Sequence, residues 1–283
     1  MHYDSDMLYI EQMEKGEKLY HYTTIDALIS IVSKNELWIT KWDYLNDIDE
    51  FRVALDACVE ILKEEKIKPE IIQDVVDSVN KDLNSLSEDF FVLSFSCDND
   101  NQLLWSNYSN YDGVNLEIDF ANFLENLNHN MLWHGLVNYN FKSQIECLRK
   151  TFYDEFIDVE DFGEIKSFSE INRLEDREYE MLISHMSIIC ELYSMFFKRD
   201  CFAGEKEYRF VFGCGRKNEI NFRSKNRTVI PYIKKHTGNV DYITGITIGP
   251  TNQVDIASKG ISELLHYYQR EVDISKSQIP LRF

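Results

Sequence analysis

A segment around residue 207 combines an apolar strand pattern with charges that such a strand accommodates poorly. Residues Tyr208 to Phe212 are rich in aromatic and β-branched side chains, which is typical of a strand. Side chains alternate between the two faces of a strand, so we expect Glu205, Glu207 and Arg209 on one face. Because unpaired buried charges are costly, this face is either solvated and paired with neighbouring charges, or it lines a cleft in which Glu207 contacts a ligand.

The composition is that of a soluble globular protein. The chain has 283 residues, of which 44% are apolar and 28% charged, enough for one large domain or two small ones. It has no apolar run near the roughly 20 residues that span a bilayer, and its N-terminus lacks the pattern of a signal peptide. The six cysteines are scattered and form no metal-ligand spacing. We therefore expect a cytoplasmic location, reduced thiols, no membrane association and no metal.

The net charge of −19 argues against a general nucleic-acid binder. The charge is uneven, however, because residues 198–235 contain 11 Lys or Arg against 4 Asp or Glu. This basic segment either compensates for the acidic helices or attracts a phosphate-bearing ligand.

The segment from residue 19 to 40 predicts a strand, a helix and a second strand. Thr23 or Thr24 is expected to cap the helix, and Asn35 to end it in a left-handed conformation. His21 lies where the first strand ends. It is either an ordinary packed residue or a group that holds ribose or phosphate oxygens together with the start of the helix.

The remaining elements alternate irregularly. An apolar strand, 90–96, ends in Ser94-Phe95-Ser96, and Asp100 or Asn101 then caps a short helix that carries Trp105 and Tyr108. Further strands are expected near 114–120, 132–141, 227–234, 242–248 and 272–274, with Pro231 indicating an edge strand. Helices are expected within 47–88, 144–198 and 254–268, and Asn46 or Asp47 with Glu50 resembles a capping box of otherwise undetermined role. This order predicts the α+β class.

These stretches coincide, in order from about residue 18 onward, with the pattern of the DUF2971 family, which the sequence resembles. The resemblance is carried by short motifs along the chain: Leu19 to Thr24, Leu45-Asn46-Asp47 with Glu50, Leu93 to Ser96, Trp105 with Tyr108 and Gly113, Glu205 to Arg209, Ile230-Pro231-Tyr232, Ile248-Gly249-Pro250 and Ser275 to Pro280. The family is defined as a domain of unknown function, so this resemblance alone implies little chemistry.

A more distant resemblance implies a chemistry. The order of His21, a Ser-x-Ser strand, an aromatic-bearing helix and a late strand with Glu207 is similar to the His-Tyr-Glu branch of the ADP-ribosyltransferase fold, and the start of the chain looks like DarT-type enzymes and RNA 2′-phosphotransferases. This resemblance implies a split antiparallel sheet around an NAD cleft. The sheet and helical insertions at about 47–88 and 144–198 would form a single DUF2971-like domain, 1–283. A tyrosine at the middle position of the His-Tyr-Glu pattern is not identified in this chain.

The resemblance also implies roles for individual residues, with NAD as the substrate. His21, Tyr22 and Thr23 would contact the adenosine-side ribose, and Ser94 or Ser96 the nicotinamide side. Trp105 or Tyr108 would stack on nicotinamide, although both rings also suit an ordinary core. Glu207 would bind the ribose 2′-hydroxyl and stabilise the positive transition state, Glu205 would orient the nucleophile, and Arg209 would pair with Glu207 or bind pyrophosphate.

Three functional hypotheses follow. The first is an NAD-consuming ADP-ribosyltransferase or NAD glycohydrolase, acting as a toxin or phage-defence effector with a protein or nucleic-acid acceptor and a protein regulator or antitoxin. The second is a non-catalytic ligand-sensing or interaction module on the same fold. The third is an RNA-end phosphotransferase or nuclease-like enzyme, which would need more basic residues near His21 than Lys18 provides. The first hypothesis predicts that His21, Tyr108 and Glu207 converge on one pocket, and it fails if Glu207 points to bulk solvent far from His21.

Overall fold

The computed structural model describes residues 8–45, 50–85, 90–127, 131–157, 159–162, 165–174, 176–214, 219–225, 227–238, 241–251 and 253–281. The chain forms two compact units. The first comprises Met1–Glu11, Leu45–Asp89 and Leu136–Ala203, and the second Gln12–Tyr44, Phe90–Gly135 and Gly204–Phe283. Both segments predicted as helical insertions, 47–88 and 144–198, lie within the first unit. The expected cap residues Asn46 and Asp47 lie outside the described residues.

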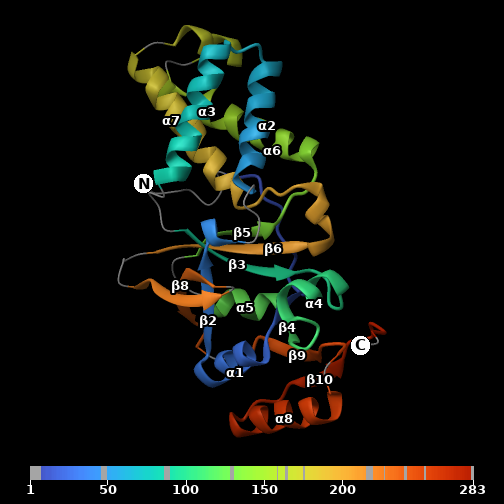
Figure 1. Cartoon of the computed structure of the whole chain (residues 1–283). Coiled ribbons are helices and arrows are strands. Elements are labelled where there is room, and N and C mark those ends of the chain that lie inside the picture. The colour runs from blue at the N-terminus through green and yellow to red at the C-terminus, as the bar shows by residue number, and fades with distance from the viewer. Residues whose placement is uncertain are drawn as a thin grey trace. The chain divides into compact units, whose positions relative to one another are not determined.

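The first unit is helical. Its main helices are α2 (Glu50–Glu64), α3 (Pro69–Ser85), α6 (Phe141–Phe156) and α7 (Asp176–Ser194), with short 3-10 turns η3 (Glu160–Phe162) and η4 (Phe168–Arg173) (Figure 1). Pro69 opens α3, where its missing N–H costs no helical hydrogen bond. Buried side chains of α7, such as Leu182 and Met186, contribute to the core of this unit.

The second unit is built on a sheet of ten strands in the described residues. One path through the sheet has the order β10-β9-β4-β1-β3-β2-β8-β7, and β6 pairs with both β3 and β5. The strands are β1 (Lys18–Thr23), β2 (Glu36–Lys41), β3 (Phe90–Ser96), β4 (Val114–Asp119), β5 (Met131–Leu136), β6 (Glu207–Gly213), β7 (Asn221–Lys225), β8 (Thr228–His236), β9 (Ile243–Ile248) and β10 (Asp273–Lys276). A mixed α+β architecture is thus confirmed.

The sheet divides along one edge of β3. β1 pairs there through Tyr20 opposite Ser96, and β2 pairs through Thr40 and Lys41 opposite Val92 and Phe91. In the described part of the chain, residues 93–95 between these pairs have no ladder partner on that edge. β6 pairs with β3 along its whole length on the other edge. The two arms of the sheet, β1-β4-β9-β10 and β2-β8-β7, therefore start from different ends of one strand.

Helix caps account for several short connections. Thr24 caps α1 (Ile25–Lys34) by accepting a hydrogen bond from the backbone N–H of Ala27, and Asn35 ends that helix at φ 51°. Asn101 caps α4 (Gln102–Ser109) through the N–H of Leu103. The sheet unit also contains α5 (Phe120–Asn126), α8 (Val254–Tyr267) and the 3-10 turn η2 (Trp42–Tyr44). These caps agree with the sequence, in which each cap residue precedes an apolar periodic run.

Three strand predictions need correction. Glu205 is not part of the Glu207 strand, because it ends the 3-10 turn η5 (Asp200–Glu205) and Lys206 follows at a left-handed φ of 45°. The strand that contains Pro231 is not an edge strand, because β8 lies between β2 and β7. Pro231 is tolerated there because the pairing with β2 ends at Tyr232.

The third correction concerns the predicted strand 132–141. β5 ends at Leu136, and Asn140 caps α6 by accepting a hydrogen bond from the N–H of Ser143. The helix then begins at Phe141, so the strand is shorter than the apolar pattern predicts. In addition, among the helices of the described residues, none has the length and apolar composition needed to cross a membrane.

Candidate functional site

Three strands bring the predicted site motifs together. β1, β3 and β6 are neighbours, and Tyr20, Ser96 and Glu207 lie opposite one another in one row across them. Two residues further along β3, Ser94 lies opposite Arg209. Opposite residues in an antiparallel ladder share a face, so these five side chains project from the same face of the sheet.

Glu207 and Arg209 form a buried ion pair. The Nη2 of Arg209 lies 2.8 Å from Oε2 of Glu207, and the two side chains are 1% and 8% exposed respectively. They are two residues apart on β6 and therefore share a face. The pairing offsets part of the cost of burying the two charges, and it is one of the two roles predicted for Arg209.

His21 lies at the division of the sheet. Its Nδ1 is 3.3 Å from the backbone carbonyl oxygen of Ser94, and its ring packs 5.3 Å from that of Phe95. Burial lowers the pKa of His21 to about 4, with a further lowering by the charge of Arg223. The imidazole is therefore neutral near pH 7. Because a carbonyl oxygen only accepts, Nδ1 carries the proton and Nε2 is left as an acceptor.

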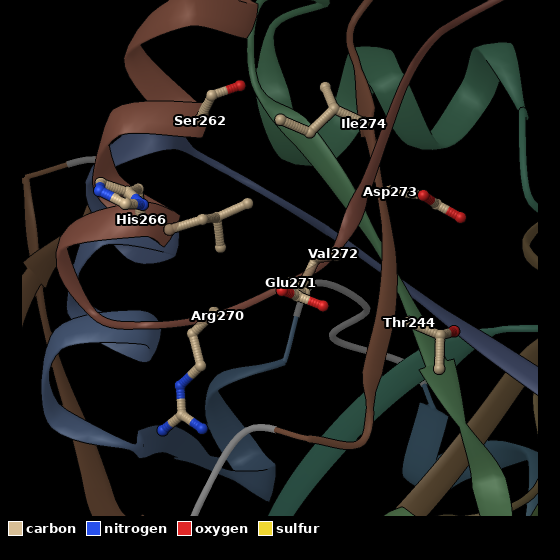
Figure 2. Close-up of a pocket in the computed structure, with 9 residues that line it drawn as sticks. Thr244, Ser262, His266, Arg270, Glu271, Val272, Asp273 and Ile274 are labelled. Atoms are coloured by element: carbon tan, nitrogen blue, oxygen red, sulfur yellow. The ribbon is translucent and has the colours of Figure 1, made fainter.

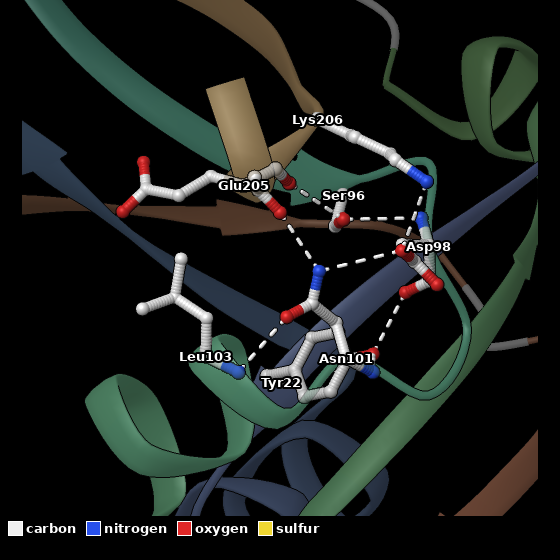
Figure 3. A network of polar contacts seen from close by, with 8 residues as sticks. Tyr22, Ser96, Asp98, Asn101, Leu103, Glu205 and Lys206 are labelled. Carbon is white, nitrogen blue, oxygen red and sulfur yellow. Dashed lines mark hydrogen bonds and ion pairs between the residues drawn. The ribbon is translucent and has the colours of Figure 1, made fainter. Parts of the chain in front are cut away.

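A polar network fixes the loop between β3 and α4 to the start of β6 (Figure 3). The hydroxyl of Ser96 donates to the carbonyl of Glu205 at 2.8 Å, and the side-chain amide of Asn101 donates to the carbonyl of Gly204 at 2.7 Å. Lys206 forms an ion pair of 3.1 Å with Asp98. Figure 3 shows the Glu205 carboxylate pointing away from these contacts. The network therefore holds Glu205 through its backbone.

The same loop is also tied to a distant segment. The carboxylate of Asp100 accepts hydrogen bonds of 2.7 Å from the indole N–H of Trp105, the hydroxyl of Ser277 and the backbone N–H of Gln278. Residues far apart in sequence thus converge on one half-buried carboxylate beside α4.

Tyr22 and Trp105 are packed within the protein. The Tyr22 hydroxyl donates to the carbonyl of Asp98 and accepts from the backbone N–H of Asn101. Its ring meets Trp105 edge-on at 4.9 Å, and Trp105 is 0% exposed. Tyr108 packs against this cluster. These contacts match the ordinary core packing that the sequence leaves open for both Trp105 and Tyr108.

Thr23 is also enclosed. A Cβ added at Gly113 would lie 2.2 Å from the Thr23 carbonyl oxygen, so only glycine allows this approach. The helix is capped by Thr24 rather than Thr23.

The strands β1 and β6 both pair with β3, but the side chains of His21, Tyr108 and Glu207 do not meet in one place. Strand alternation places His21 on the face opposite to Tyr20, Ser96 and Glu207, although its ring turns toward the edge of β3 at Ser94. Tyr108 belongs to the α4 cluster. The expected convergence of His21, Tyr108 and Glu207 on one pocket is therefore not observed among the described residues.

Sequence reasoning missed a basic residue near His21. Arg223 lies on β7, which was not predicted, yet its charge acts on the pKa of His21. The available signal was the alternation of Phe222, Arg223 and Ser224 before the Thr228 strand, which suggests a hairpin partner.

A pocket of about 520 Å³ lies elsewhere in the second unit (Figure 2). It is formed by α8, β9, β10 and the connection between α8 and β10. It contains none of the predicted site residues, and its lining consists of Thr244, Ser262, Leu265, His266, Arg270, Glu271, Val272, Asp273 and Ile274.

Residues 104–210 match the DUF2971 family model. The model is described as a protein of unknown function, and the match confirms the DUF2971 resemblance. The matched region begins within α4, includes α6 and α7, and continues in β6 as far as Phe210, so it ends within the strand that carries Glu207 and Arg209. No curated protein and no solved structure matches the chain significantly.

Proposed function

We propose that the chain consumes NAD, either as an ADP-ribosyltransferase or as an NAD glycohydrolase. The observation that carries the proposal is the adjacency of β1, β3 and β6. These strands bring together three motifs that are widely separated in sequence: His21, the Ser-x-Ser strand and Glu207. The division of the sheet beside His21 is a second observation in favour of a split-sheet fold of the ADP-ribosyltransferase type.

The chemistry assigns a task to each group. The bond between the ribose C1′ and the nicotinamide nitrogen breaks, and its electron pair leaves with nicotinamide. Positive charge develops on the ribose, where the carboxylate of Glu207 stabilises it. Water or an acceptor then adds to C1′ and releases a proton. His21 accepts a hydrogen bond from a ribose hydroxyl through Nε2, because its Nδ1 faces the Ser94 carbonyl.

The decisive experiment measures nicotinamide release from NAD by the purified chain and by Glu207→Gln. Glutamine keeps the shape and still accepts a hydrogen bond from Arg209, but it lacks the negative charge. Removal of a single electrostatic stabiliser lowers rates by about 100- to 1000-fold in other enzymes, and we expect a loss of this size. Cell lysate is added in parallel as a source of acceptors.

Glu117→Gln is the matched control. Glu117 also lies on a strand of this sheet and forms an ion pair with Lys18, but its side chain is 28% exposed. We expect turnover to be unchanged in this variant. Absence of nicotinamide release by the unmodified protein, with and without lysate, would reject the proposal, as would equal rates for Glu207→Gln and the unmodified protein.

A non-catalytic ligand-sensing module is the second candidate. It is favoured by the Glu207–Arg209 ion pair, which already satisfies the carboxylate, and by the placement of His21 on the opposite face. Binding of NAD without turnover would support this candidate.

A further inference from the structure

A second polar region lies on the arm of the sheet formed by β2, β8 and β7. Trp38 of β2 and Tyr232 of β8 are stacked, with ring centroids 4.6 Å apart and planes inclined by 30°. Strand registers place Arg223 of β7 on the same face, because Asn221 lies opposite Tyr232 and Arg223 is two residues further on. We call these three residues the aromatic–arginine patch.

Arg223 extends over both rings. Its guanidinium carbon lies 5.5 Å from the Tyr232 centroid and 5.9 Å from the Trp38 centroid, which is within cation–π range. Its Nη2 donates to the hydroxyl of Thr40 at 2.7 Å. The Nε is buried and has no hydrogen-bond partner among the described residues. Much of the donor capacity of this guanidinium is thus directed to no described protein group.

The charge of the patch is not neutralised. Lys225 shares a face with Arg223, and in the described part of the chain neither side chain has a carboxylate within ion-pair distance. Burial lowers the pKa of both groups, and the charge of Arg223 lowers the pKa of Lys225 further. The protein has 49 acidic residues against 30 basic ones, so two adjacent cations without an acidic neighbour form a local positive region that suits an external anion.

A buried carboxylate fixes the aromatic side of the patch. Glu36 is 5% exposed, accepts a hydrogen bond of 2.7 Å from the indole N–H of Trp38, and lies 3.3 Å from the ammonium of Lys234. The indole is therefore held in one orientation and Lys234 is already neutralised. Trp38 itself is only half-buried, so part of its ring surface faces solvent.

We propose that the aromatic–arginine patch binds a nucleotide, with a phosphate between Arg223 and Lys225 and the base against Trp38. A guanidinium matches phosphate geometry with paired donors, and aromatic rings hold bases by stacking. The net charge of −19 disfavours a long polyanion, so a mononucleotide or one half of a dinucleotide fits better than nucleic acid. This inference does not depend on NAD turnover.

The test is isothermal titration calorimetry of the full chain at low ionic strength with AMP, NAD, adenosine, inorganic phosphate and a single-stranded oligonucleotide. We expect AMP or NAD to bind at least tenfold more tightly than adenosine or phosphate. The comparison of AMP with NAD shows whether the patch prefers a free mononucleotide or a dinucleotide. Arg223→Gln should weaken binding at least tenfold, and Trp38→Leu should weaken AMP more than phosphate.

Lys235→Gln is the control, because Lys235 is adjacent to Lys234 but lies on the opposite face over the Phe212 ring. The affinity of Lys235→Gln for AMP and NAD should match that of the unmodified protein. The proposal is overturned if neither AMP nor NAD binds, if Arg223→Gln binds equally well, if phosphate binds as tightly as AMP, or if only the oligonucleotide binds. Thermal unfolding of each variant shows whether a loss of binding reflects loss of fold.

Discussion

Two charged regions lie on the same face of one sheet, but their charges are compensated differently. On β6, Glu207 and Arg209 face each other at 2.8 Å and are almost fully buried. On β7, Arg223 and Lys225 share a face without a carboxylate partner among the described residues. The two charges of the first region compensate each other, whereas the charges of the second region have no such partner in the described part of the chain. The comparison indicates that the β6 pair preserves a defined geometry and that the β7 pair is available for a ligand.

The largest expected effect comes from removing one member of the β6 pair. Arg209→Met leaves the Glu207 carboxylate buried without its guanidinium, and we expect the free energy of unfolding to fall by about 3–5 kcal/mol. Urea denaturation measures this change. The double variant Glu207→Gln/Arg209→Met is the control and should be clearly more stable than Arg209→Met alone. Additive effects of the two substitutions would show that the pair is not coupled.

The next effect concerns the neutral His21 between the two regions. Its pKa is about 4 in the fold against 6.5 for the free group, so the unfolded chain binds a proton first as the pH falls. Stability should therefore be unaffected above pH 6.5 and should decline by up to about 3 kcal/mol between pH 6.5 and 4. Denaturation at several pH values measures the slope.

In His21→Gln, the slope of stability between pH 6.5 and 4 should be smaller. His134 provides a comparison, because burial also lowers its pKa. An unchanged slope in His21→Gln would contradict the buried, neutral imidazole.

The smallest expected effect is on the β7 side. Arg223→Met keeps an apolar side chain over the rings and removes a charge that has no acidic partner, so the free energy of unfolding should change by less than about 1 kcal/mol. If Arg223→Met lowered the free energy of unfolding as much as Arg209→Met, the proposed difference between the two regions would be wrong. Thermal unfolding in chloride and in phosphate buffer sharpens the comparison, because only the protein with Arg223 should gain stability from phosphate.

Local chemistry made part of the fold predictable from sequence. Thr24, Asn35 and Asn101 mark helix ends through contacts within a few residues, and all three appear where the sequence indicates. The run of apolar residues from Phe90 to Ser96 also predicts a strand, and β3 has these bounds. Such signals are recognisable because the residues that satisfy them are neighbours in the chain.

Pairings between distant strands were not predictable in the same way. The sequence contains no signal for the registers that divide the sheet at β3, and β7 was missed because its composition is mainly polar. For this reason the sequence indicates only Lys18 as a basic residue near His21, whereas the charge of Arg223 also lowers the pKa of His21. The adjacency of His21, Ser94 to Ser96 and Glu207 was anticipated only through resemblance to a family.

The hydrogen bonds on Asp100 have a consequence for the order in which the chain is completed. Ser277 and Gln278 lie 177 and 178 residues downstream of this carboxylate. At translation rates of about 5–20 residues per second, Ser277 and Gln278 are synthesised on the order of ten seconds or more after Asp100. The loop that anchors the start of the Glu207 strand therefore acquires its full set of contacts only after most of the chain has left the ribosome. Assembly of the site is in this way delayed until late in synthesis.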